Sequence, residues 1–424
     1  QKQRHLKILV ANFQGIFNKK DQFNDFLITE NIDIVIGSES HLKPSIKDNE
    51  FLLQNYSSFR NDRSDGWGGV IIITKKNLIT EQVMLPVKSE LIAIKIESHH
   101  HPLIKCACYR SPNRNHLEME NLCNDIYQIM NKNKNSNIWI GGDFNLPDID
   151  WETNSMTSNR YPTESDWRIP CTAIQLKCMT SNRYPVAINE CFLNLMNNAQ
   201  LEQIVDFPTR GKNFLDILLA NNKTLLHNIT DVPGISDHTS MILADIYTHP
   251  IYLKPPERKI IQWNIADKEH IKVSLQKEIT KFCHLNNKEN PVEKLWNSFT
   301  KTIENEKSKL PIKILSNRYN QPWITTACKR FSCRKKRCYR RARKTQLSSD
   351  WERFREINKK ANAAYRDAYN KYIDRSFSTE NNKKLYKYIK NKRRDYVGVA
   401  PLREEGKTQL SVNDEGKARI LNQQ

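Results

Sequence analysis

The segment NIWIGGDFN, residues 137–145, ends an apolar run with side chains that can take part in catalysis. Asp143 and Asn145 are two positions apart, and in an extended chain such residues point to the same side. The two glycines before them allow a close approach of backbone or ligand. Taken alone, the segment also fits an Asx turn at the end of a strand. The choice between a turn and a site therefore depends on the rest of the chain.

Further polar residues occur where other apolar runs stop. Asp216 lies inside FLDILLA, where a charge is costly to bury without a partner. Each such residue alone is explained as a cap, a turn or an ion-pair residue. Together, two amides, four carboxylates, a tyrosine and a histidine favour a site. Such a set suits phosphodiester hydrolysis, which needs hard oxygen ligands for Mg²⁺, a group that orients water and a positive group beside the phosphate. These residues are Asn12, Glu39, Tyr109, Asp143, Asn145, Asp216, Asp237 and His238, and Arg110, next to Tyr109, is a candidate nucleic-acid contact.

The positive charge of the chain is concentrated in its C-terminal part. Residues 1–250 contain 25 Lys and Arg against 28 Asp and Glu, whereas residues 251–424 contain 42 against 19. A strongly cationic segment joined to a near-neutral one indicates a polyanionic partner, most simply nucleic acid, although a solvated basic helix is the alternative. In 328–344, ten of seventeen residues are Lys or Arg. The candidate nucleic-acid contacts there are Arg334, Lys335, Lys336, Arg337, Arg340 and Arg341.

The sequence shows neither a membrane segment nor a strong cysteine motif. No run of 18 apolar residues occurs and the N-terminus has no signal pattern, so we expect no membrane contact and a nuclear or cytoplasmic protein that is not secreted. The ten cysteines form no CxxC pair. Cys328, Cys333 and Cys338 give only a weak zinc signal, and we expect ordinary thiols there.

The elements that would position the polar residues alternate along the first 247 positions. Short β-rich runs alternate with polar or helical ones, which predicts an α+β domain with sheets buried on both sides. Amphipathic helices are predicted at 20–30 and 116–130. Strands are predicted at 7–10, 32–36, 69–74, 91–96, 104–109, 138–140, 214–220 and 241–246.

The pattern changes after this first domain. Prolines interrupt it, and we predict a linker at 248–262, followed by a basic, mainly helical region at 263–424. A stripe at helical spacing that includes Trp351, Phe354 and Ile357 predicts helix packing rather than a cofactor site.

One internal repeat interrupts the first domain. MTSNRYP occurs at 156–162 and again at 179–185. Without one copy the chain would run smoothly into a helix predicted near 187–198. We therefore predict a repeat or insertion loop at 156–185, which a surface position accommodates at small entropic cost. The extra copy is interpreted as a local duplication or a gene-model artefact.

The order of these motifs resembles that of the endonuclease/exonuclease/phosphatase family. N-x-x-G, S-E-S-H-L, G-G-V, Y-R-x-P-N, G-D-F-N, L-D and S-D-H follow one another across about residues 7–247. The nearest resemblance is to the apurinic-like endonuclease domain of LINE-type (non-LTR) retrotransposon polyproteins. The later region is similar, largely in composition, to the linker that leads to the reverse transcriptase in such elements, with PWIT at 322–325 and KARILN at 417–422 in the expected order.

The resemblance implies a two-layer β-sandwich flanked by helices, with the site at one end of the sandwich. It makes Glu39 the principal ligand of Mg²⁺, or of Mn²⁺ in its place, with Asn12 and Asp237 near the metal. The other matches are Asp143, which orients or deprotonates water, Asn145, which helps to hold the phosphate, His238, which contacts the phosphate, Asp216, which pairs with the histidine, and Tyr109, which supports the transition state.

Two of these positions have physical consequences. A carboxylate beside His238 would raise the imidazolium fraction near neutral pH, where positive charge stabilises the phosphorane. The family commonly has Gln before the metal-binding Glu, whereas Ser38 precedes Glu39 here. A contact behind the metal ligand is then lost or bridged by water.

We therefore expect a Mg²⁺-dependent phosphodiester hydrolase in domain 1–247 that nicks DNA to leave a 3′-hydroxyl, as in target-primed retrotransposition. The expected partners are a DNA substrate and, through the basic helical region, element RNA. No polymerase motif precedes Gln424, so we expect a truncated element. The alternatives are an inactive or domesticated nucleic-acid-binding protein, and a hydrolase of the same fold that acts on RNA or phosphoinositides.

Overall fold

The computed structural model describes residues 5–84, 86–112, 115–151, 153, 155–156, 186–253, 258–262, 264–285, 292–315, 323–377, 386, 389, 402–403, 410–411 and 414–422. Contacts divide the chain into two compact units, residues 1–253 with 319–424 and residues 254–318. Of the predicted repeat loop at 156–185, residues 157–185 lie outside the described residues. None of the helices in the described ranges combines the length and the apolar character needed to cross a bilayer.

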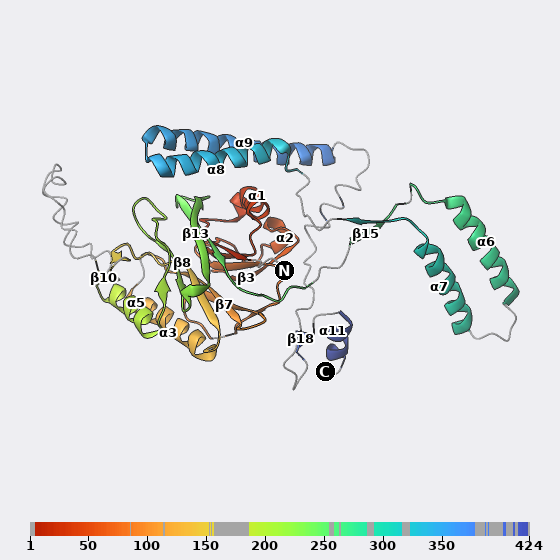
Figure 1. Ribbon diagram of the computed structural model, residues 1–424, viewed down its shortest axis with the longest axis horizontal. Helices are drawn as coiled ribbons and strands as arrows, with labels where there is room; N and C mark the ends of the chain where they lie inside the picture. Colours follow the sequence, from red (N-terminus) through yellow and green to blue (C-terminus); the bar gives the residue numbers. More distant parts are fainter. Residues whose placement is uncertain are drawn as a thin grey trace. The chain divides into compact units, whose positions relative to one another are not determined.

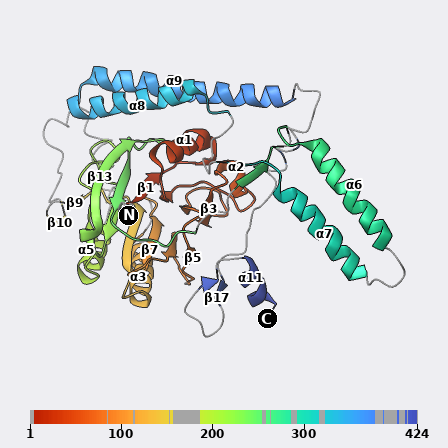
Figure 2. The ribbon, with the colours of Figure 1, turned by 45° about the vertical axis from the view of Figure 1, so that its right-hand side comes forward.

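The first unit contains two six-stranded sheets that form a sandwich (Figures 1 and 2). The first sheet has the order β13-β14-β1-β2-β4-β3, in which only β1 and β2 pair in parallel. Its strands are β1 (Leu6–Asn12), β2 (Ile34–Ser38), β3 (Tyr56–Asn61), β4 (Val70–Lys75), β13 (Leu226–Pro233) and β14 (Ser240–Ile246).

The second sheet has the order β11-β12-β8-β7-β6-β5, and only β7 and β8 are parallel. Its strands are β5 (Thr80–Gln82), β6 (Leu91–Ile96), β7 (Leu103–Tyr109), β8 (Asn137–Asp143), β11 (Glu202–Gln203) and β12 (Asp216–Ala220). A small pair, β9 (Ile149–Asp150) and β10 (Ser155–Met156), follows β8.

The core has three layers, because side chains alternate across each strand. The inner layer joins the facing sides of both sheets and includes Val10, Ile36, Trp139 and Leu218. Such an arrangement removes apolar surface from water at about 25 cal/mol per Å².

Helices cover the outer faces of both sheets. On the first sheet lie α1 (Lys20–Glu30) and the short α2 (Asp48–Phe51), which contribute Phe23, Leu27 and Phe51 to its outer core. On the second lie α3 (His116–Lys132) and α5 (Val186–Asn198), whose Ile126 and Phe192 pack there. The 3-10 turns η1 (Phe17–Lys19) and η3 (Lys223–Leu225) connect elements of the sandwich.

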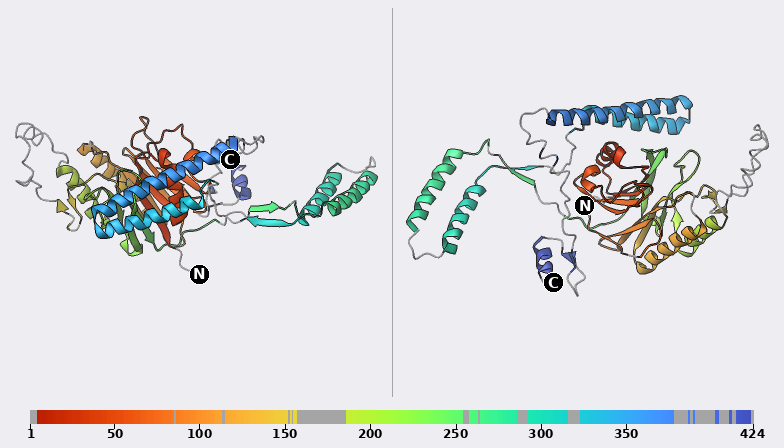
Figure 3. Two further views of the ribbon diagram at one scale, coloured as in Figure 1. Left: turned by 90° about the horizontal axis from the view of Figure 1, so that it is seen from above. Right: turned by 180° about the vertical axis from the view of Figure 1, so that it is seen from behind.

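A helical hairpin of α8 (Thr326–Thr345) and α9 (Ser348–Phe377) packs on the sandwich (Figures 1 and 3). Tyr339 is 1% exposed, and its hydroxyl donates to Asp231 Oδ2 of β13 at 2.9 Å. Since that proton is used, Ser240 Oγ donates to Tyr339 at 2.8 Å. Arg343 Nε donates to the same Asp231 oxygen at 2.6 Å. The hairpin is therefore fixed beside the start of β14.

Two further contacts join the hairpin to α1. Lys336 Nζ lies 2.6 Å from Glu30 Oε1. Lys335 is buried near Asp25, and burial lowers its pKa to about 8 although the charge of Asp25 opposes that change. The predicted packing stripe is confirmed, because Phe354, Ile357, Ala361 and Tyr365 of α9 are buried.

The second unit contains β15 (Arg258–Ile261), which pairs antiparallel with β16 (Ile312–Leu315), and the helices α6 (Lys268–Leu285) and α7 (Val292–Ser308). The predicted linker, 248–262, thus contains a strand, and the predicted region 263–424 contributes to both units. Near the C-terminus are β17 (Leu402–Arg403), β18 (Leu410–Ser411) and α11 (Asp414–Leu421).

The predicted α+β sandwich with a helical C-terminal region is confirmed. Helix 20–30 matches α1 at both ends, and all eight predicted strands are present with small shifts at their ends. The prediction missed β3 and β13, which form the two edges of the first sheet, and the short strands β5, β9, β10 and β11.

Candidate active site

The site is built where the inward-facing rows of several strands change from apolar to polar. In β8 the row runs Trp139, Gly141, Asp143, and in β12 it runs back from Leu218 to Asp216. Asp143 pairs in register with Asp216 on one side and with Tyr109 of β7 on the other. Three predicted site residues therefore lie side by side on adjacent strands, at one end of the inner core.

The two glycines of β8 are required by close packing. A Cβ on Gly142, which has φ +144°, would lie 1.9 Å from the carbonyl oxygen of Cys108 in β7. A Cβ on Gly141 would lie 3.2 Å from side-chain carbons of both Ile36 and Val10 in the facing sheet. The glycines thus let β7 and the first sheet approach the strand that carries Asp143.

Asn12 connects carboxylates from the two sheets. Its Nδ2 donates to Glu39 Oε1 and to Asp143 Oδ2, each at 2.8 Å. Its Oδ1 accepts from the backbone N–H of Gln14 at 3.1 Å. The amide nitrogen rather than the oxygen thus faces the carboxylates, and a metal contact by Asn12 stays a prediction.

Several loop residues at the site adopt left-handed backbone conformations. Glu39 has φ 48°, His41 has φ 49° and Asn145 has φ 49°. Such conformations cost on the order of 1 kcal/mol or more for residues with a Cβ and persist where surrounding contacts impose them. Here the backbone N–H of His41 donates to Gly68 O at 3.0 Å, and that of Asn145 donates to Asp143 Oδ1 at 3.1 Å.

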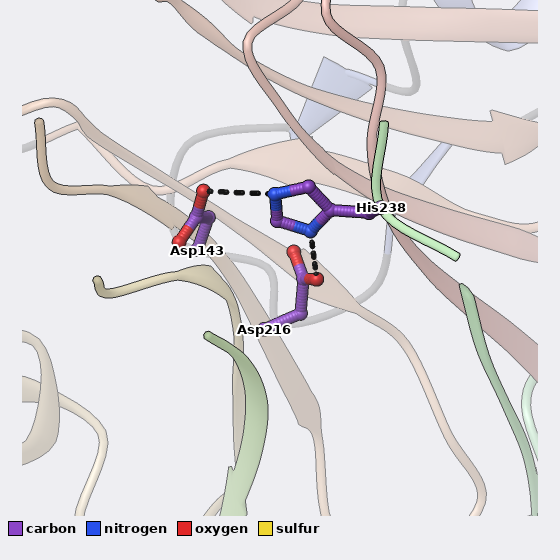
Figure 4. Close-up of side chains that lie close together, drawn as sticks. All are labelled: Asp143, Asp216 and His238. Carbon is purple, nitrogen blue, oxygen red and sulfur yellow. Dashed lines mark hydrogen bonds and ion pairs between the residues drawn. The ribbon is translucent and has the colours of Figure 1, made fainter. Parts of the chain in front are cut away.

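His238 lies between two carboxylates, as Figure 4 shows. Its Nδ1 is 2.5 Å from Asp216 Oδ2, and its Nε2 is 3.8 Å from Asp143 Oδ2. Burial lowers the pKa of His238, but the charge of Asp216 and the hydrogen bond to it outweigh burial and raise that pKa to about 9. The imidazolium form therefore predominates at neutral pH, with Nε2 directed toward Asp143.

The surroundings of Asp143 disfavour its ionised form. It is 1% exposed, and burial, followed by the charge of Asp216, raises its pKa to about 8 although His238 and Asn12 act in the opposite direction. Asp216 Oδ1 is also buried and has no hydrogen-bond partner in the described part of the chain. A divalent cation bound beside these buried carboxylate oxygens would stabilise their negative charge.

The oxygen atoms at this end of the sandwich fit a divalent metal. Asp143, Asp216 and His238 bring ligating atoms within 4.8 Å of one another. A metal bound by His238, however, would need the neutral ring, whereas the contact with Asp216 favours the charged ring. The hard oxygens of Glu39 and Asp143, which Asn12 holds together, are therefore better ligands for a hard divalent cation than the imidazole is.

Tyr109 and Asn145 lie at the site in different ways. Burial, then the nearby charge of Glu39, raises the pKa of Tyr109, whose hydroxyl also bonds to Glu39, so it stays a neutral donor. The Asn145 side chain donates to the carbonyl of Arg110 at 2.7 Å, and its N–H orients Asp143. Its direct contact with phosphate stays a prediction.

Two predicted residues are turned away from the cluster. Arg110 is 4% exposed and its guanidinium donates to the carbonyl of Asn145 at 3.2 Å, so it supports the loop after β8 rather than presenting a charge to solvent. Asp237 is exposed and pairs with Arg210 at 2.6 Å. Its charge contributes to the raised pKa of His238, and it opposes the lowering of the Lys19 pKa by burial, which places Asp237 at the rim.

Sequence analysis missed the residues that hold the cluster together. Thr209 is fully buried, and its hydroxyl accepts from the backbone N–H of Asp216 at 3.1 Å. Its carbonyl accepts from the N–H of Ser240 at 3.2 Å, which links the loop of His238 to β12. Lys19 donates to the carbonyl of Phe13 at 2.6 Å near the Asn12 loop. A single buried threonine outside the strands produces no periodic pattern in the sequence. Its role in supporting Asp216 is therefore visible only from tertiary contacts.

The basic residues of α8 that were predicted to contact nucleic acid lie on two different sides of the helix. Arg334, Arg337, Arg340 and Arg341 are exposed, whereas Lys335 is buried and Lys336 is half-buried against Glu30. The four arginines are therefore accessible to a polyanion, and the two lysines serve the contact with α1.

One family model matches part of the chain. Residues 103–242 match the model of a family described as endonuclease-reverse transcriptase, a span that contains Tyr109, Asp143, Asp216 and His238 and follows Asn12 and Glu39. No curated protein matches the sequence.

Among solved structures, the chain is similar to the endonuclease domain of TRAS1, a telomere-specific non-LTR retrotransposon, with 14% identity over 58% of this chain and 99% of that chain and a TM-score of 0.40. It is also similar to the catalytic domain of Xenopus laevis APE2, with 14% identity, 59% and 94% coverage and a TM-score of 0.41. A third similar structure is an AP endonuclease from Archaeoglobus fulgidus, with 15% identity, 57% and 99% coverage and a TM-score of 0.40.

Proposed function

We propose that this protein, whose residues 103–242 match the family described as endonuclease-reverse transcriptase, is a Mg²⁺-dependent DNA endonuclease of the LINE type that leaves a 3′-hydroxyl at the nick. The observation that carries the proposal is one connected cluster at the end of the sandwich. Glu39 and Asp143 share the amide of Asn12, and Asp143 faces the charged pair of His238 and Asp216.

The proposed reaction is hydrolysis of a backbone phosphodiester. A water oxygen bonds to phosphorus, the bond from phosphorus to the 3′ oxygen breaks, and the products are a 5′-phosphate and a 3′-hydroxyl. One proton of the water passes to the base and the leaving oxygen takes up a proton. A 3′-hydroxyl of this kind would serve as the primer in target-primed retrotransposition.

The chain's own residues divide the work of this reaction. Asp143 holds and deprotonates the attacking water, oriented by the N–H of Asn145. The Nε2–H of His238 stabilises the negative charge that develops on phosphorus, because Asp216 keeps the ring protonated. The neutral hydroxyl of Tyr109 provides a second donor.

Glu39 and Asp143, with Asp237 at the rim, would hold the cation, and Mn²⁺ would take the place of Mg²⁺ at such oxygens. When bound, a divalent cation supplies positive charge against the phosphate oxygens.

A plasmid assay tests the proposal directly. The full chain is incubated with supercoiled plasmid and Mg²⁺, and the expected result is an open circle whose nick primes extension by a DNA polymerase without phosphatase treatment. Asp143→Ala and His238→Ala should each reduce nicking by about 10³-fold or more, while Asp367→Ala, an exposed carboxylate on α9, serves as the matched control. Nicking that survives both site substitutions would contradict the mechanism.

Assays of the same protein on RNA and on phosphoinositides, beside the plasmid, separate the alternative functions. Cleavage of RNA or release of phosphate from phosphoinositides at a higher rate than plasmid nicking would replace DNA as the substrate. Binding without any turnover would leave a nucleic-acid-binding protein. The basic hairpin supports a nucleic-acid substrate, because it adds a dense positive charge to a domain that is itself near neutral.

A further inference from the structure

A cavity of about 260 Å³ opens at the seam between α8 and α9. Four arginines line it together with one carboxylate and one thiol, from residues Arg334, Arg337, Cys338, Arg341, Asp350 and Arg353. The three arginines of α8 are three and four residues apart, so they share one face of that helix. Arg353 comes from the first turns of α9, and the two helices therefore complete the pocket jointly.

This arginine pocket lies on the side of α8 that does not contact the sandwich. Lys335 and Tyr339 are buried in that contact, whereas Arg337 and Arg341 are exposed. At about 100° per residue, Arg337 and Arg341 are turned by more than 150° from Tyr339 around the helix axis. The hairpin thus uses one face to hold the nuclease domain and presents the pocket on the other.

The pocket has an excess of positive charge. Its carboxylate is already used, because Asp350 Oδ1 lies 2.9 Å from Arg341 Nε and its Oδ2 accepts from Thr345 at 2.8 Å. No described residue forms an ion pair within 4 Å of Arg334, Arg337 or Arg353. Glu356 lies within electrostatic range of Arg334 and Arg353, but its own partner is Lys360 at 2.5 Å. Guanidinium groups gathered in this way repel one another until an anion joins them.

We propose that the arginine pocket binds backbone phosphates of the nucleic acid on which this protein acts. Planar guanidinium groups match phosphate oxygens with paired hydrogen bonds, and several of them around one cavity select an anion with several oxygens. Without a bound cation, the carboxylates of Glu39, Asp143 and Asp216 at the active site repel phosphates. The pocket on the hairpin attracts them from a fixed position, since Tyr339 ties α8 to Ser240, two residues beyond His238.

The proposal rests on the proposed nucleic-acid substrate, and it is tested by binding in the absence of divalent metal. The full chain is titrated in EDTA with a fluorescent DNA duplex and, separately, with a single-stranded RNA, at several salt concentrations. The pocket variant carries Arg334→Gln and Arg353→Gln. The matched control carries Arg330→Gln and Lys344→Gln, which remove two exposed charges of α8 outside the pocket.

We expect the pocket variant to bind about 10- to 100-fold more weakly at 0.1 M salt, with a salt slope reduced by about 1 to 2, and the control to change affinity by less than about 3-fold. A loss in the duplex arm supports the proposal for the DNA that is cut. A loss confined to the RNA arm would overturn it, because the pocket would then bind an RNA other than the substrate. Equal losses in pocket and control variants would overturn the proposal, because they would show a diffuse attraction without a site.

Nicking kinetics separate this proposal from the proposed function. At saturating plasmid the pocket variant should keep the wild-type rate, while its KM rises in proportion to the lost affinity. A wild-type protein that binds through the pocket but never nicks would refute the endonuclease and leave the pocket in place. A wild-type protein that nicks, together with a pocket variant whose binding is unchanged, would refute the pocket and leave the endonuclease in place. Thermal melting of both variants checks that each is folded.

Discussion

The two helical pairs of this chain, α8–α9 and α6–α7, differ in what their amphipathic faces contact. The α8–α9 pair buries Tyr339, Phe354, Ile357 and Tyr365 against itself and the sandwich. The α6–α7 pair belongs to the separate unit, 254–318, and leaves large apolar side chains in solvent. On α7 these are Trp296, Phe299 and Ile303, with exposed fractions of 59%, 42% and 42%.

The difference shows that density of positive charge does not decide whether a helix packs. In α8, ten of twenty residues are Lys or Arg and none is acidic, yet it is the helix that docks. It docks because acidic partners stand opposite its inward face, Glu30 and Asp231 in particular, and because Tyr339 supplies a buried ring. Charge complementarity thus allows a helix with strong net charge to share a core.

Truncation of the buried Tyr339 ring should cause the largest loss of stability, and it should remove most of the difference between the two helical pairs. Tyr339→Ala removes a side chain that packs 5.3 Å from Phe354, between ring centroids, and leaves Asp231 and Ser240 short of a partner. We expect a loss of about 3 to 4 kcal/mol in urea unfolding followed by circular dichroism. Tyr339→Phe keeps the ring and should cost only about 1 kcal/mol. Equal losses for the two variants would mean that the ring is not packed as described.

The buried lysine of α8 predicts that the stability of the α8–α9 pair depends on pH. Burial lowers the pKa of Lys335 to about 8 from the ordinary 10.5. Between these values the unfolded chain binds more protons than the folded one, so stability rises as the pH increases from about 8 to about 10.5. The rise attributable to Lys335 should be at most about 3 kcal/mol.

The difference between wild type and Lys335→Met isolates this contribution, and Lys344→Met, on the exposed side of α8, is the control. A wild type and a Lys335→Met variant with identical stability curves from pH 8 to 10.5 would contradict the burial of a charged amine at this position.

Removal of one acidic partner should have a moderate effect. Asp231→Asn keeps the size of the side chain but weakens the contacts with Tyr339 and Arg343, and we expect a loss of about 1 to 2 kcal/mol. Asp367→Asn breaks an exposed pair with Lys371 at 2.8 Å and should cost about 0.3 to 0.5 kcal/mol. The same unfolding measurement applies to both. A larger loss for Asp367→Asn would show that the docked contacts do not determine the stability of the hairpin.

The smallest effect is expected in α7. Trp296→Ala removes a large but exposed ring and should change the free energy of unfolding by no more than about 0.5 kcal/mol. A loss above about 1 kcal/mol would show that this stripe is covered in the intact protein, and the contrast between the two helical pairs would disappear.

The sequence predicted those features that depend on local pattern and on motif order. Alternation located the buried strands. The end of the apolar run 138–140 pointed to Asp143, and the cost of burying a charge within FLDILLA pointed to Asp216. The pairing anticipated for His238 corresponds to the 2.5 Å contact with Asp216. The missed edge strands β3 and β13 have few buried residues, so they lack a strong period-two pattern.

Other features depend on contacts between distant segments, which a single sequence does not encode locally. Thr209 supports Asp216 only because the chain returns beside β12, and Ser240 meets Tyr339 from 99 positions away. Lys335 and Arg334 are adjacent in a basic run, yet one is buried and the other exposed, because the phase of α8 is fixed by its docking. Charge density alone assigned both to nucleic acid.

The alignment of Tyr109, Asp143 and Asp216 across three neighbouring strands constrains how this protein can evolve. Inserting or deleting one residue within β7, β8 or β12 would rotate a reactive group to the opposite face of the sheet, and the others would lose their neighbour. Changes in length are therefore tolerated only in the connections between strands. Divergence among related enzymes should accordingly accumulate as loops of variable size around a frame of invariant strand length.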